Sequence, residues 1–287
     1  MARRVQDCNV TIIGLGLMGG SLAGALRGKC RSVVGVARRS DAVERALALG
    51  LVDRATTDAG DGVSSADIAI LATPVRVILR QMAELAPLLP EECLLLDLGS
   101  TKGQIVAAME GLPGHIQPLG GHPMCGKEVS GIEVADPTLY RGTTFILSPL
   151  ERTSEAALAL GKDLARAIGA QPLVLDAERQ DFLVGTLSHL PYLLACALVA
   201  TADATTSPDP AAWEIVAGGF RDTSRVSGSD VTMMLDILLT NPTEVLQAVD
   251  TFQGQLQNLA DLIEAGDENG LRAALDATRS TRLRMFP

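Results

Sequence analysis

A glycine-rich turn near the start of the chain has the spacing of a phosphate-binding loop. Gly14, Gly16 and Gly19 form the pattern GxGxxG, which follows an apolar stretch at residues 10–13 and precedes residues that can begin a helix. In this pattern the first glycine makes the turn, the second lets the backbone approach a pyrophosphate, and the third lets the helix pack against the strand. Free N–H groups at the helix start would donate to the phosphates. The predicted dinucleotide contacts are Gly14, Gly16, Leu17, Met18 and Gly19.

The end of the next predicted strand indicates which dinucleotide is bound. Residues 32–37 have the pattern of a strand, and Arg38, Arg39 and Ser40 follow it. Sites that prefer NAD place an Asp or Glu about 20 residues past the glycines, whereas an Arg there accommodates the 2′-phosphate of NADP. We therefore predict NADP as the cofactor, held by these three residues. The alternative is that the two arginines belong to an ordinary solvated loop.

His122 has the most unusual surroundings of the three histidines. It lies in GGHPMCGKEVSG (residues 120–131), where glycine and proline predict irregular backbone at the surface of the sheet's carboxyl edge. The oxidation of an alcohol requires a group that takes the hydroxyl proton as hydride leaves, and neutral imidazole suits that role near neutral pH. His122 is therefore a candidate base. A hydrogen-bonded structural histidine is the alternative, and the residues alone favour neither.

Ser100 follows a predicted strand at residues 93–97. Thr101 and Gln104, in the same stretch DLGSTKGQ, have the spacing of a capping box and predict the start of a helix. In a functional interpretation, the Ser100 hydroxyl would lie beside the nicotinamide and hydrogen-bond a substrate oxygen. From these residues alone, the helix start is the favoured interpretation.

Two motifs in the second half carry polar side chains. The sequence SHLPY (residues 188–192) places a histidine and a proline inside a predicted helix, and GGFRDTSR (residues 218–225) holds Arg221 and Arg225 four residues apart. If the second stretch is helical, both arginines lie on one face. One can pair with Asp222 or Asp230, and the other can bind a substrate carboxylate through two hydrogen bonds.

The elements that must position these residues fall into two groups. Strands alternate with helices as far as residue 176, which predicts a doubly wound, parallel sheet, an α/β domain of the Rossmann type over residues 1–176. Ligands of such sheets bind beyond the carboxyl ends of the strands, so Thr73 and Pro74, which end the strand at residues 66–72, join the predicted cofactor contacts. Residues 177–287 show helical patterns only (182–204, 210–217, 231–240, 242–265 and 269–284), which predicts an all-helical dimerisation domain.

Composition narrows the partners. The 287 residues carry a net charge of −10, which argues against nucleic acid or an anionic membrane surface as a partner. The five cysteines are scattered and odd in number, which favours free thiols in a reducing compartment and no metal site. We find no signal peptide and no apolar stretch of the ~20 residues that a membrane helix requires. We therefore expect a soluble cytoplasmic protein that binds a small molecule and a second copy of itself.

Five motifs in order resemble the prephenate and arogenate dehydrogenase family of tyrosine biosynthesis. They are GLGLMGGSLA, DLGSTK, GGHPMCGKEVSG, SHLPY and GGFRDTSR, and the resemblance covers nearly the full chain. It implies a dinucleotide-binding domain followed by a helical domain that interlocks in a homodimer. The implied reaction is oxidative decarboxylation, in which hydride passes from ring C4 of a cyclohexadienol to NAD(P) and the ring carboxylate leaves as carbon dioxide.

The same resemblance assigns roles to individual residues. The family's catalytic histidine falls on His122, and its strand-end serine falls on Ser100, which would orient the C4 hydroxyl. Arg225 matches the arginine that holds the substrate carboxylate. Arg221 matches a basic position of less certain role, and His189 matches the first histidine of the family's SHLPH pattern.

Two departures from the family pattern bear on the substrate. Tyr192 stands where many members that prefer prephenate have a second histidine, and Gln180-Asp181 stands where several have His-Asp. With these differences and the arginines of the predicted NADP site, the sequence is more similar to arogenate dehydrogenases than to prephenate dehydrogenases. We therefore expect NADP-dependent oxidation of arogenate to tyrosine, with prephenate and NAD(P) as the alternative. Tyr192 joins the predicted substrate contacts.

Two further alternatives remain at this stage. A β-hydroxyacid or imine dehydrogenase is disfavoured, because the former would use a lysine in the second domain and Lys162, the only lysine after Lys127, belongs to a helix predicted at residues 151–169. A non-enzymatic NADP-sensing protein would bind cofactor without depending on His122. We also expect no regulatory domain after the helices and no fused chorismate mutase before the glycines, so that feedback by tyrosine would act at the active site.

Overall fold

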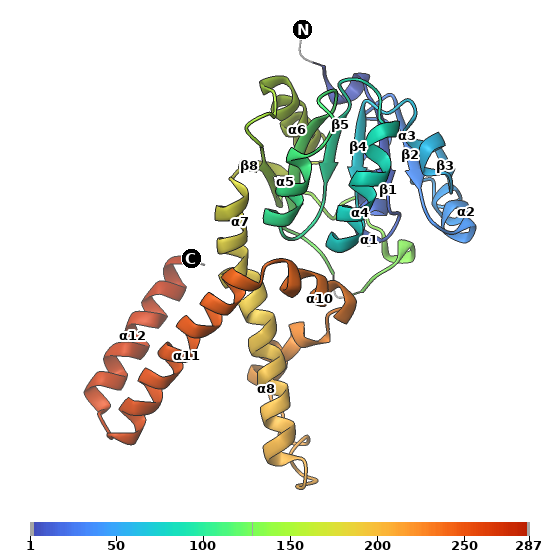
Figure 1. Cartoon of the computed structure of the whole chain (residues 1–287). Coiled ribbons are helices and arrows are strands. Elements are labelled where there is room, and N and C mark those ends of the chain that lie inside the picture. The colour runs from blue at the N-terminus through green and yellow to red at the C-terminus, as the bar shows by residue number, and fades with distance from the viewer. Residues whose placement is uncertain (1–2, 128, 286–287) are drawn as a thin grey trace.

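The first part of the chain is a sheet covered by helices on both faces. The structure, a computed structural model, describes residues 3–127 and 129–285 (Figure 1). Its strands run in the order β3-β2-β1-β4-β5-β6-β7-β8, and neighbouring strands are parallel except β6 and β7. The strands are β1 (Asn9–Ile13), β2 (Ser32–Val36), β3 (Arg54–Thr56), β4 (Ile68–Leu71), β5 (Leu94–Asp97), β6 (Gln117–Pro123), β7 (Thr144–Ser148) and β8 (Gln171–Val174). This arrangement confirms the predicted dinucleotide-binding fold.

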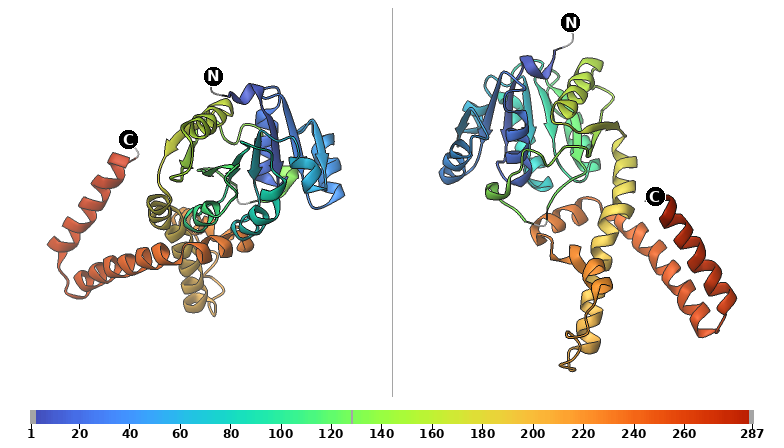
Figure 2. Two further views of the ribbon diagram at one scale, coloured as in Figure 1. Left: turned by 45° about the horizontal axis from the view of Figure 1, so that its top comes forward. Right: turned by 180° about the vertical axis from the view of Figure 1, so that it is seen from behind.

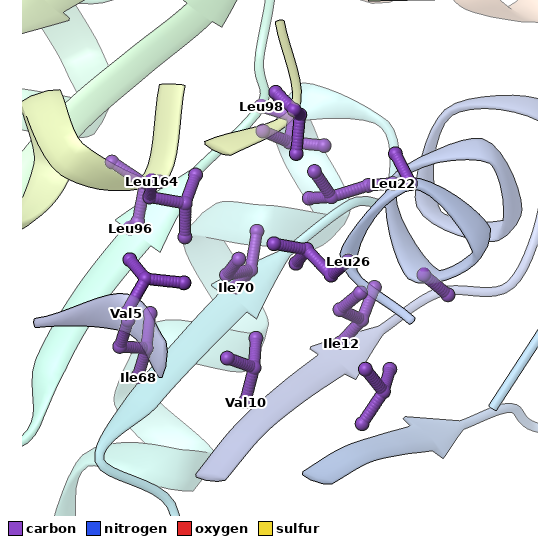
Figure 3. Close-up of a cluster of buried hydrophobic side chains, with 14 of the residues drawn as sticks. Val5, Val10, Ile12, Leu22, Leu26, Ile68, Ile70, Leu96, Leu98 and Leu164 are labelled. Carbon is purple, nitrogen blue, oxygen red and sulfur yellow. The ribbon is translucent and has the colours of Figure 1, made fainter. Parts of the chain in front are cut away.

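Aliphatic side chains fill the core on both faces of the sheet. Leu22 and Leu26 pack on one face with Leu164 (Figure 3), and Ile78 and Met109 pack on the other. Burial of such side chains is the main stabilising term of a domain of this size. The covering helices are α1 (Leu17–Leu26), α2 (Ser40–Ala48), α3 (Ala59–Val63), α4 (Val75–Leu85), α5 (Gly103–Glu110) and α6 (Glu155–Ala167).

The turn between β1 and α1 requires its glycines. Gly14 has φ +103°, a conformation that residues with a Cβ rarely adopt. A Cβ on Gly19 would lie 1.8 Å from the carbonyl oxygen of Gly14, so only glycine lets the helix start this close to the turn. The first and third positions of the motif therefore have the structural reasons that the sequence predicts.

The strand that carries His122 differs from the prediction. Irregular surface backbone was expected over residues 120–131, but residues 120–123 belong to β6, a buried strand between β5 and β7. The expectation holds for residues 124–127 and 129–131, which form no helix or strand. The glycines of β6 are explained by close packing rather than by a loop: a Cβ on Gly121 would lie 2.5 Å from the carbonyl oxygen of Asp97. For β6 the expectation was wrong because glycine in a strand can also mark a close approach of two backbones.

The second part of the chain is helical, as predicted. In Figures 1 and 2, α8 and the hairpin of α11 and α12 extend away from the sheet. The predicted helix at residues 210–217 is absent, and that segment forms turns. The elements are α7 (Ala177–Val184), a π-helical turn (Gly185–His189), α8 (Leu190–Thr206), α9 (Gly218–Ser224), α10 (Val231–Thr240), α11 (Pro242–Glu264) and α12 (Glu268–Met285).

The helical segment Ala177–Thr206 is long and apolar enough to cross a bilayer, by length and composition alone. It has 30 residues and a mean hydropathy of 1.8 in its most apolar window. This corrects the expectation that no stretch reaches such a length, because the helix predicted at residues 182–204 is continuous and its mean hydropathy stays high despite the polar residues Ser188 and His189. Near its start, Gln180 and Asp181 are buried and hydrogen-bonded to the sheet domain, so this helix joins the two parts of the chain.

Candidate active site

One cavity of about 770 Å³ lies at the carboxyl edge of the sheet and extends to the helical domain. It combines the glycine turn and the ends of β4, β5 and β6 with residues of the π-helical turn, α8 and α10. The predicted site residues that line it are Gly16, Leu17, Met18, Thr73, Pro74, Ser100, His122, His189 and Tyr192. The structure therefore brings predicted cofactor contacts, the candidate base and part of the predicted substrate site into one space.

The glycine turn fits a dinucleotide. A Cβ on Gly16 would meet no protein atom within 4 Å, although Gly16 lines the cavity. The absence of a side chain there leaves room for a pyrophosphate to approach the backbone at the start of α1. Thr73, at the neighbouring strand end, is held by a 2.6 Å hydrogen bond from its hydroxyl to Gln81.

Arg38, Arg39 and Ser40 lie next to this turn but outside the cavity lining. The N–H of Gly14 donates to the carbonyl oxygen of Val36 at 2.9 Å, so the end of β2 is joined directly to the glycine turn. Arg38 and Arg39 are exposed there, and Arg39 forms a 3.1 Å ion pair with Asp41. Ser40 is the first residue of α2. Gly14 and Gly19 shape the turn without lining the cavity.

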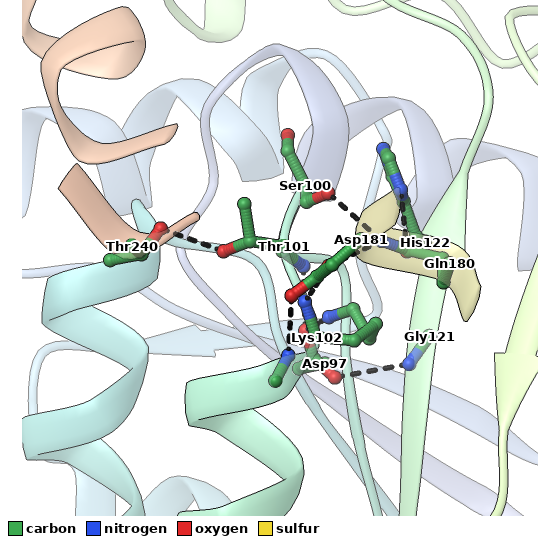
Figure 4. A network of polar contacts seen from close by, with 11 residues as sticks. Asp97, Ser100, Thr101, Lys102, Gly121, His122, Gln180, Asp181 and Thr240 are labelled. Carbon is green, nitrogen blue, oxygen red and sulfur yellow. Dashed lines mark hydrogen bonds and ion pairs between the residues drawn. The ribbon is translucent and has the colours of Figure 1, made fainter. Parts of the chain in front are cut away.

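His122 is buried and its ring is held by an amide. Its Nδ1 lies 2.9 Å from Oε1 of Gln180, which belongs to α7. In Figure 4 the second ring nitrogen points away from Gln180, on the same side as the Ser100 side chain. Burial lowers the pKa of His122 to about 3, and the nearby charge of Lys102 acts in the same direction. The imidazole is therefore neutral at physiological pH, as a general base must be.

A buried ion pair lies beneath the two candidate catalytic residues. Asp97, at the end of β5, pairs with Lys102, and both side chains are fully buried. The Asp97 carboxylate also accepts from the N–H groups of Gly99, at 2.7 Å, and Gly121, at 3.0 Å. Because these glycines immediately precede Ser100 and His122, one carboxylate fixes the backbone of both. Burial raises the pKa of Asp97 and lowers that of Lys102, and their mutual contact opposes both shifts.

The predicted capping box at the start of α5 does not form. The helix begins at Gly103, and no side chain caps its N-terminus. Thr101 instead shares a 2.7 Å hydrogen bond with Thr240 of α10. The prediction was wrong because Thr101 contacts the helical domain rather than its own helix. Its neighbour Ser100 is left facing the cavity, as the functional interpretation requires.

Asp181 connects the two domains under the cavity. Its carboxylate accepts from the N–H groups of Lys102 and Gly103, each at 2.7 Å. Its carbonyl oxygen accepts a 2.8 Å hydrogen bond from Asn241, whose amide also lies 3.5 Å from Nδ1 of His189. Burial lowers the pKa of His189 to about 4, so this second histidine is also neutral.

The arginines of the helical domain lie at the margin of the site. Arg221 is in the last turn of α9, whereas Arg225 follows that helix and begins a 3₁₀ turn. Both are exposed, and neither is among the described residues that line the cavity. The residue after Arg225, Val226, does line it. The structure thus places Arg225 next to the cavity wall rather than within it.

Several buried polar residues of this region were given no role by the sequence analysis. Gln180 was noted only as a departure from a family pattern, and Asp97 and Lys102 only as members of a motif. The signal was present, because Asp and Lys are almost never fully buried unless paired. Their burial, however, depends on tertiary packing that the sequence does not show. These residues are Asp97, Lys102, Gln180, Asp181, Asp236 and Asn241.

A glycine turn that fits a pyrophosphate shares a cavity with a buried neutral imidazole and a serine. This combination defines a dinucleotide-dependent oxidoreductase. Comparison with known proteins gives the family. The model of the prephenate dehydrogenase nucleotide-binding domain matches residues 22–174, and that of the prephenate dehydrogenase dimerisation domain matches residues 176–277. The chain therefore belongs to the prephenate dehydrogenase family.

Individual relatives agree with this assignment. The chain is 32% identical to prephenate dehydrogenase of Bacillus subtilis, over 91% of this chain and 72% of the relative, and 32% identical to cyclohexadienyl dehydrogenase of Zymomonas mobilis, over 96% and 95%. Among solved structures, Aquifex aeolicus prephenate dehydrogenase with hydroxyphenyl propionate and NAD⁺ has a TM-score of 0.90 at 32% identity, covering 96% of this chain and 98% of that one. Synechocystis arogenate dehydrogenase has a TM-score of 0.85 at 29% identity, covering 96% and 99%.

These findings establish the activity at the level of the family. The chain is an NAD(P)-dependent prephenate/arogenate dehydrogenase, an oxidoreductase of tyrosine biosynthesis. It consists of a nucleotide-binding domain and a helical dimerisation domain. The predicted family and enzyme class are confirmed, and the non-enzymatic alternative is excluded. The comparisons include relatives named for prephenate and for arogenate, so the preferred substrate and cofactor are argued from the residues of this chain.

Proposed function

We propose that the chain oxidises arogenate with NADP, releasing carbon dioxide and tyrosine. Tyr192 supports a preference for arogenate. It lines the cavity, and many members that prefer prephenate have at this position a histidine, which can carry a positive charge. The two substrates differ only in the side chain, which is a keto acid in prephenate and an amino acid in arogenate. Relatives of both names occur among the matches, so the substrate rests on the residues of this chain.

NADP is supported by the end of β2. Two exposed arginines and a serine stand where an acidic residue would accept hydrogen bonds from the ribose hydroxyls of NAD. No Asp or Glu occurs in the sequence between the glycine turn and Arg38. The Aquifex relative was solved with NAD⁺. The arginines of this chain are therefore the observation that carries NADP over NAD.

Each site residue has a defined task in this proposal. When bound along the glycine turn, NADP would supply the acceptor for the hydride that leaves ring C4 of the substrate. His122 takes the proton of the C4 hydroxyl through its free ring nitrogen, and Ser100 hydrogen-bonds that hydroxyl and orients it. As the C4 carbonyl forms, the bond from C1 to the ring carboxylate breaks, and its electrons complete the aromatic ring.

The helical domain holds the rest of the substrate. We assign the substrate carboxylate to Arg225, because it adjoins Val226 in the cavity wall and a guanidinium binds a carboxylate through two hydrogen bonds. His189 and Tyr192 contact the substrate from the same side. Arg221, about one helical turn before Arg225, adds a second positive charge on this side of the helical domain.

The assembly and location complete the proposal. Residues 1–176 form the dinucleotide-binding domain and residues 177–287 form the helical domain of a cytoplasmic homodimer, without nucleic acid or membrane partners. The last strand ends at Val174 and the first helix of the second domain begins at Ala177, which supports this division. Exposed apolar side chains on α10 and α11 support a subunit interface; among them are Leu235, Leu239, Leu246 and Leu256.

Steady-state kinetics with the four pairings of arogenate or prephenate and NADP or NAD tests this function. We expect the highest kcat/KM for arogenate with NADP, measured as absorbance of the reduced nicotinamide. A higher value for prephenate with either cofactor would establish the alternative, a prephenate dehydrogenase that forms 4-hydroxyphenylpyruvate. Turnover of neither substrate would refute the reaction itself.

A further inference from the structure

Gln180 is the one side chain that hydrogen-bonds the ring of His122 among the contacts of the described residues. The side chain is fully buried, with 0% exposure, and its Oε1 lies 2.9 Å from Nδ1. Its Nε2 donates to Oδ1 of Asp181 at 2.7 Å and lies 3.5 Å from the carbonyl oxygen of Ser100. Both ends of the amide are therefore engaged, one by the imidazole and one by a carboxylate (Figure 4).

Asp181 determines which end of the amide faces His122. Backbone N–H groups of Lys102 and Gly103 donate to its two oxygens, so the carboxylate is held in place and presents acceptors. An acceptor can only be met by the NH₂ group of Gln180, because the amide oxygen would be repelled. The opposite end, Oε1, must then face the imidazole. The orientation of the amide thus follows from chemistry rather than from its shape.

An acceptor at Nδ1 specifies the tautomer of a neutral imidazole. Nδ1 must carry the proton to donate to Oε1, which leaves the lone pair on Nε2. We propose that Gln180, oriented by Asp181, is the positioning residue that fixes His122 as the Nδ1–H tautomer and presents the Nε2 lone pair to the substrate hydroxyl. This inference rests on the proposed role of His122 as the base. The proton moves from the substrate oxygen to Nε2, and Gln180 itself exchanges none.

An amide in this position has a different consequence from a carboxylate. It fixes the tautomer without offering a negative charge that would stabilise the imidazolium. The charged or titratable groups that face His122 are Lys102 and His189, while the carboxylates of Asp97 and Asp181 are occupied by Lys102 and by backbone N–H groups. The base therefore stays neutral over a wide pH range. A carboxyl group at position 180 would lie against the Asp181 carboxylate, and repulsion between the like charges would keep a proton shared by the two groups.

Two substitutions separate these effects. Gln180→Met keeps the length of the side chain but removes the acceptor, and we expect kcat to fall roughly 10- to 100-fold with KM changed less than about threefold. Gln180→Glu keeps an acceptor for Nδ1–H, but its second oxygen replaces Nε2 in the 2.7 Å contact with Asp181, so kcat should stay within about threefold of wild type only while the two carboxyl groups share a proton. Its kcat/KM should fall as pH rises and the shared proton is lost, through an inflection that wild type does not show. Gln117→Met, at the far end of β6, is the matched control and should leave kcat and the pH profile unchanged.

Nitrogen NMR of the wild-type protein gives a reading that requires neither turnover nor a variant at position 180. The chain has only three histidines, so His122→Asn identifies the signals of His122 by their loss. We expect a protonated Nδ1 and an unprotonated Nε2 at pH 7. Three results would overturn the inference. They are a protonated Nε2, a folded Gln180→Met variant that is as fast as wild type, and a Gln180→Glu variant whose pH profile is the same as that of wild type. If one of these results is found while the wild-type enzyme is active, the inference fails and the proposed function stands. If the wild-type protein shows the expected tautomer but turns over neither substrate, only the proposed function fails.

Discussion

The two domains bury their apolar side chains to very different extents. In the sheet domain the inner strands of the sheet, from β2 across to β7, are buried, only the edge strands β3 and β8 are not, and two apolar clusters cover the faces of the sheet. In the helical domain α12 has no buried residue, and α11, with 23 residues, buries only Val245 and Ala248. A single copy of the sheet domain therefore has a complete core, whereas the helical domain exposes apolar surface of the kind that a second subunit covers.

The polar contacts show the complementary pattern. At the seam between the domains, buried hydrogen bonds link Lys102 to Asp181 and Thr101 to Thr240. An ion pair also links Arg76 of α4, whose side chain is half exposed, to Asp236 of α10. Such contacts give orientation more than stability, because burial of polar groups costs free energy that the contacts only offset. In the proposed mechanism the sheet domain supplies the scaffold, the cofactor turn and the base, and the helical domain supplies the groups that orient the base and hold the substrate.

The largest expected effect concerns the base on the sheet domain. We expect His122→Asn to lower kcat by about 100-fold or more, because the proton of the substrate hydroxyl loses its acceptor. Cofactor affinity, measured by fluorescence titration, should change little, since the predicted pyrophosphate contacts come from the glycine turn between β1 and α1 and His122 is assigned to the substrate hydroxyl. An unchanged kcat would remove His122 from the mechanism.

The next effect tests whether the helical domain is completed by a partner. Leu246, on α11, is 66% exposed, and we expect Leu246→Glu to weaken the dimer by about 100-fold, since a charge would be buried without a partner. Leu88→Glu is the matched control, because Leu88 is 49% exposed on the sheet domain. Sedimentation over a range of concentrations measures both. Equal behaviour of the two variants would contradict the contrast between the domains.

Substrate binding by the helical domain gives the third test. We expect Arg225→Ala to raise KM for arogenate roughly 10- to 100-fold with a smaller change in kcat, because a charge-assisted contact to a carboxylate is lost. Sedimentation and thermal unfolding of the same variant serve as controls. Loss of folding or of the dimer, with KM unchanged in the remaining enzyme, would mean that Arg225 is structural.

Acid should destabilise the seam between the domains through its buried histidines. His122 has a pKa of about 3 in the folded state, against an ordinary value of 6.5. The unfolded state therefore binds more protons between these values, and stability is lost as pH falls below 6.5. Urea titration at pH 7 and pH 5 measures this loss of stability. Between these two pH values, we expect the free energy of unfolding of wild type to fall by about 2 kcal/mol more than that of His122→Asn. An equal drop in both proteins would contradict the burial of a neutral imidazole.

The smallest expected effect concerns the preference for NADP over NAD. Arg38→Ala should weaken NADP binding about tenfold and leave NAD binding nearly unaltered, because only NADP carries the 2′-phosphate. Isothermal titration with both cofactors makes the comparison. Equal losses for NADP and NAD would refute the assignment of Arg38 to that phosphate.

The sequence predicted the parts of the fold that depend on local patterns. Strands such as β1 and helices such as α10 follow from apolar periodicity, and Gly14 and Gly19 follow from the steric needs of one turn. It missed β6, because the glycines beside His122 indicate a loop as readily as a close approach of backbones. Local patterns cannot distinguish these two uses of glycine.

The candidate site was predicted unevenly for a similar reason. His122 and Ser100 were found through their motifs, and both line the cavity. Gln180 and Asp97 act through contacts to residues 58 and 24 positions away along the chain, which no local pattern encodes. Arg225 was assigned by resemblance, and its place beside the cavity leaves its role as a prediction.

A crystal structure with NADP and the phenolic product tests the central claim most directly. The account predicts that the product ring lies between the nicotinamide and Nε2 of His122, with its carboxylate bound to Arg225. If the side chains of His122 and Arg225 instead opened onto separate clefts, with no space for one ring between them, the proposed chemistry would be contradicted.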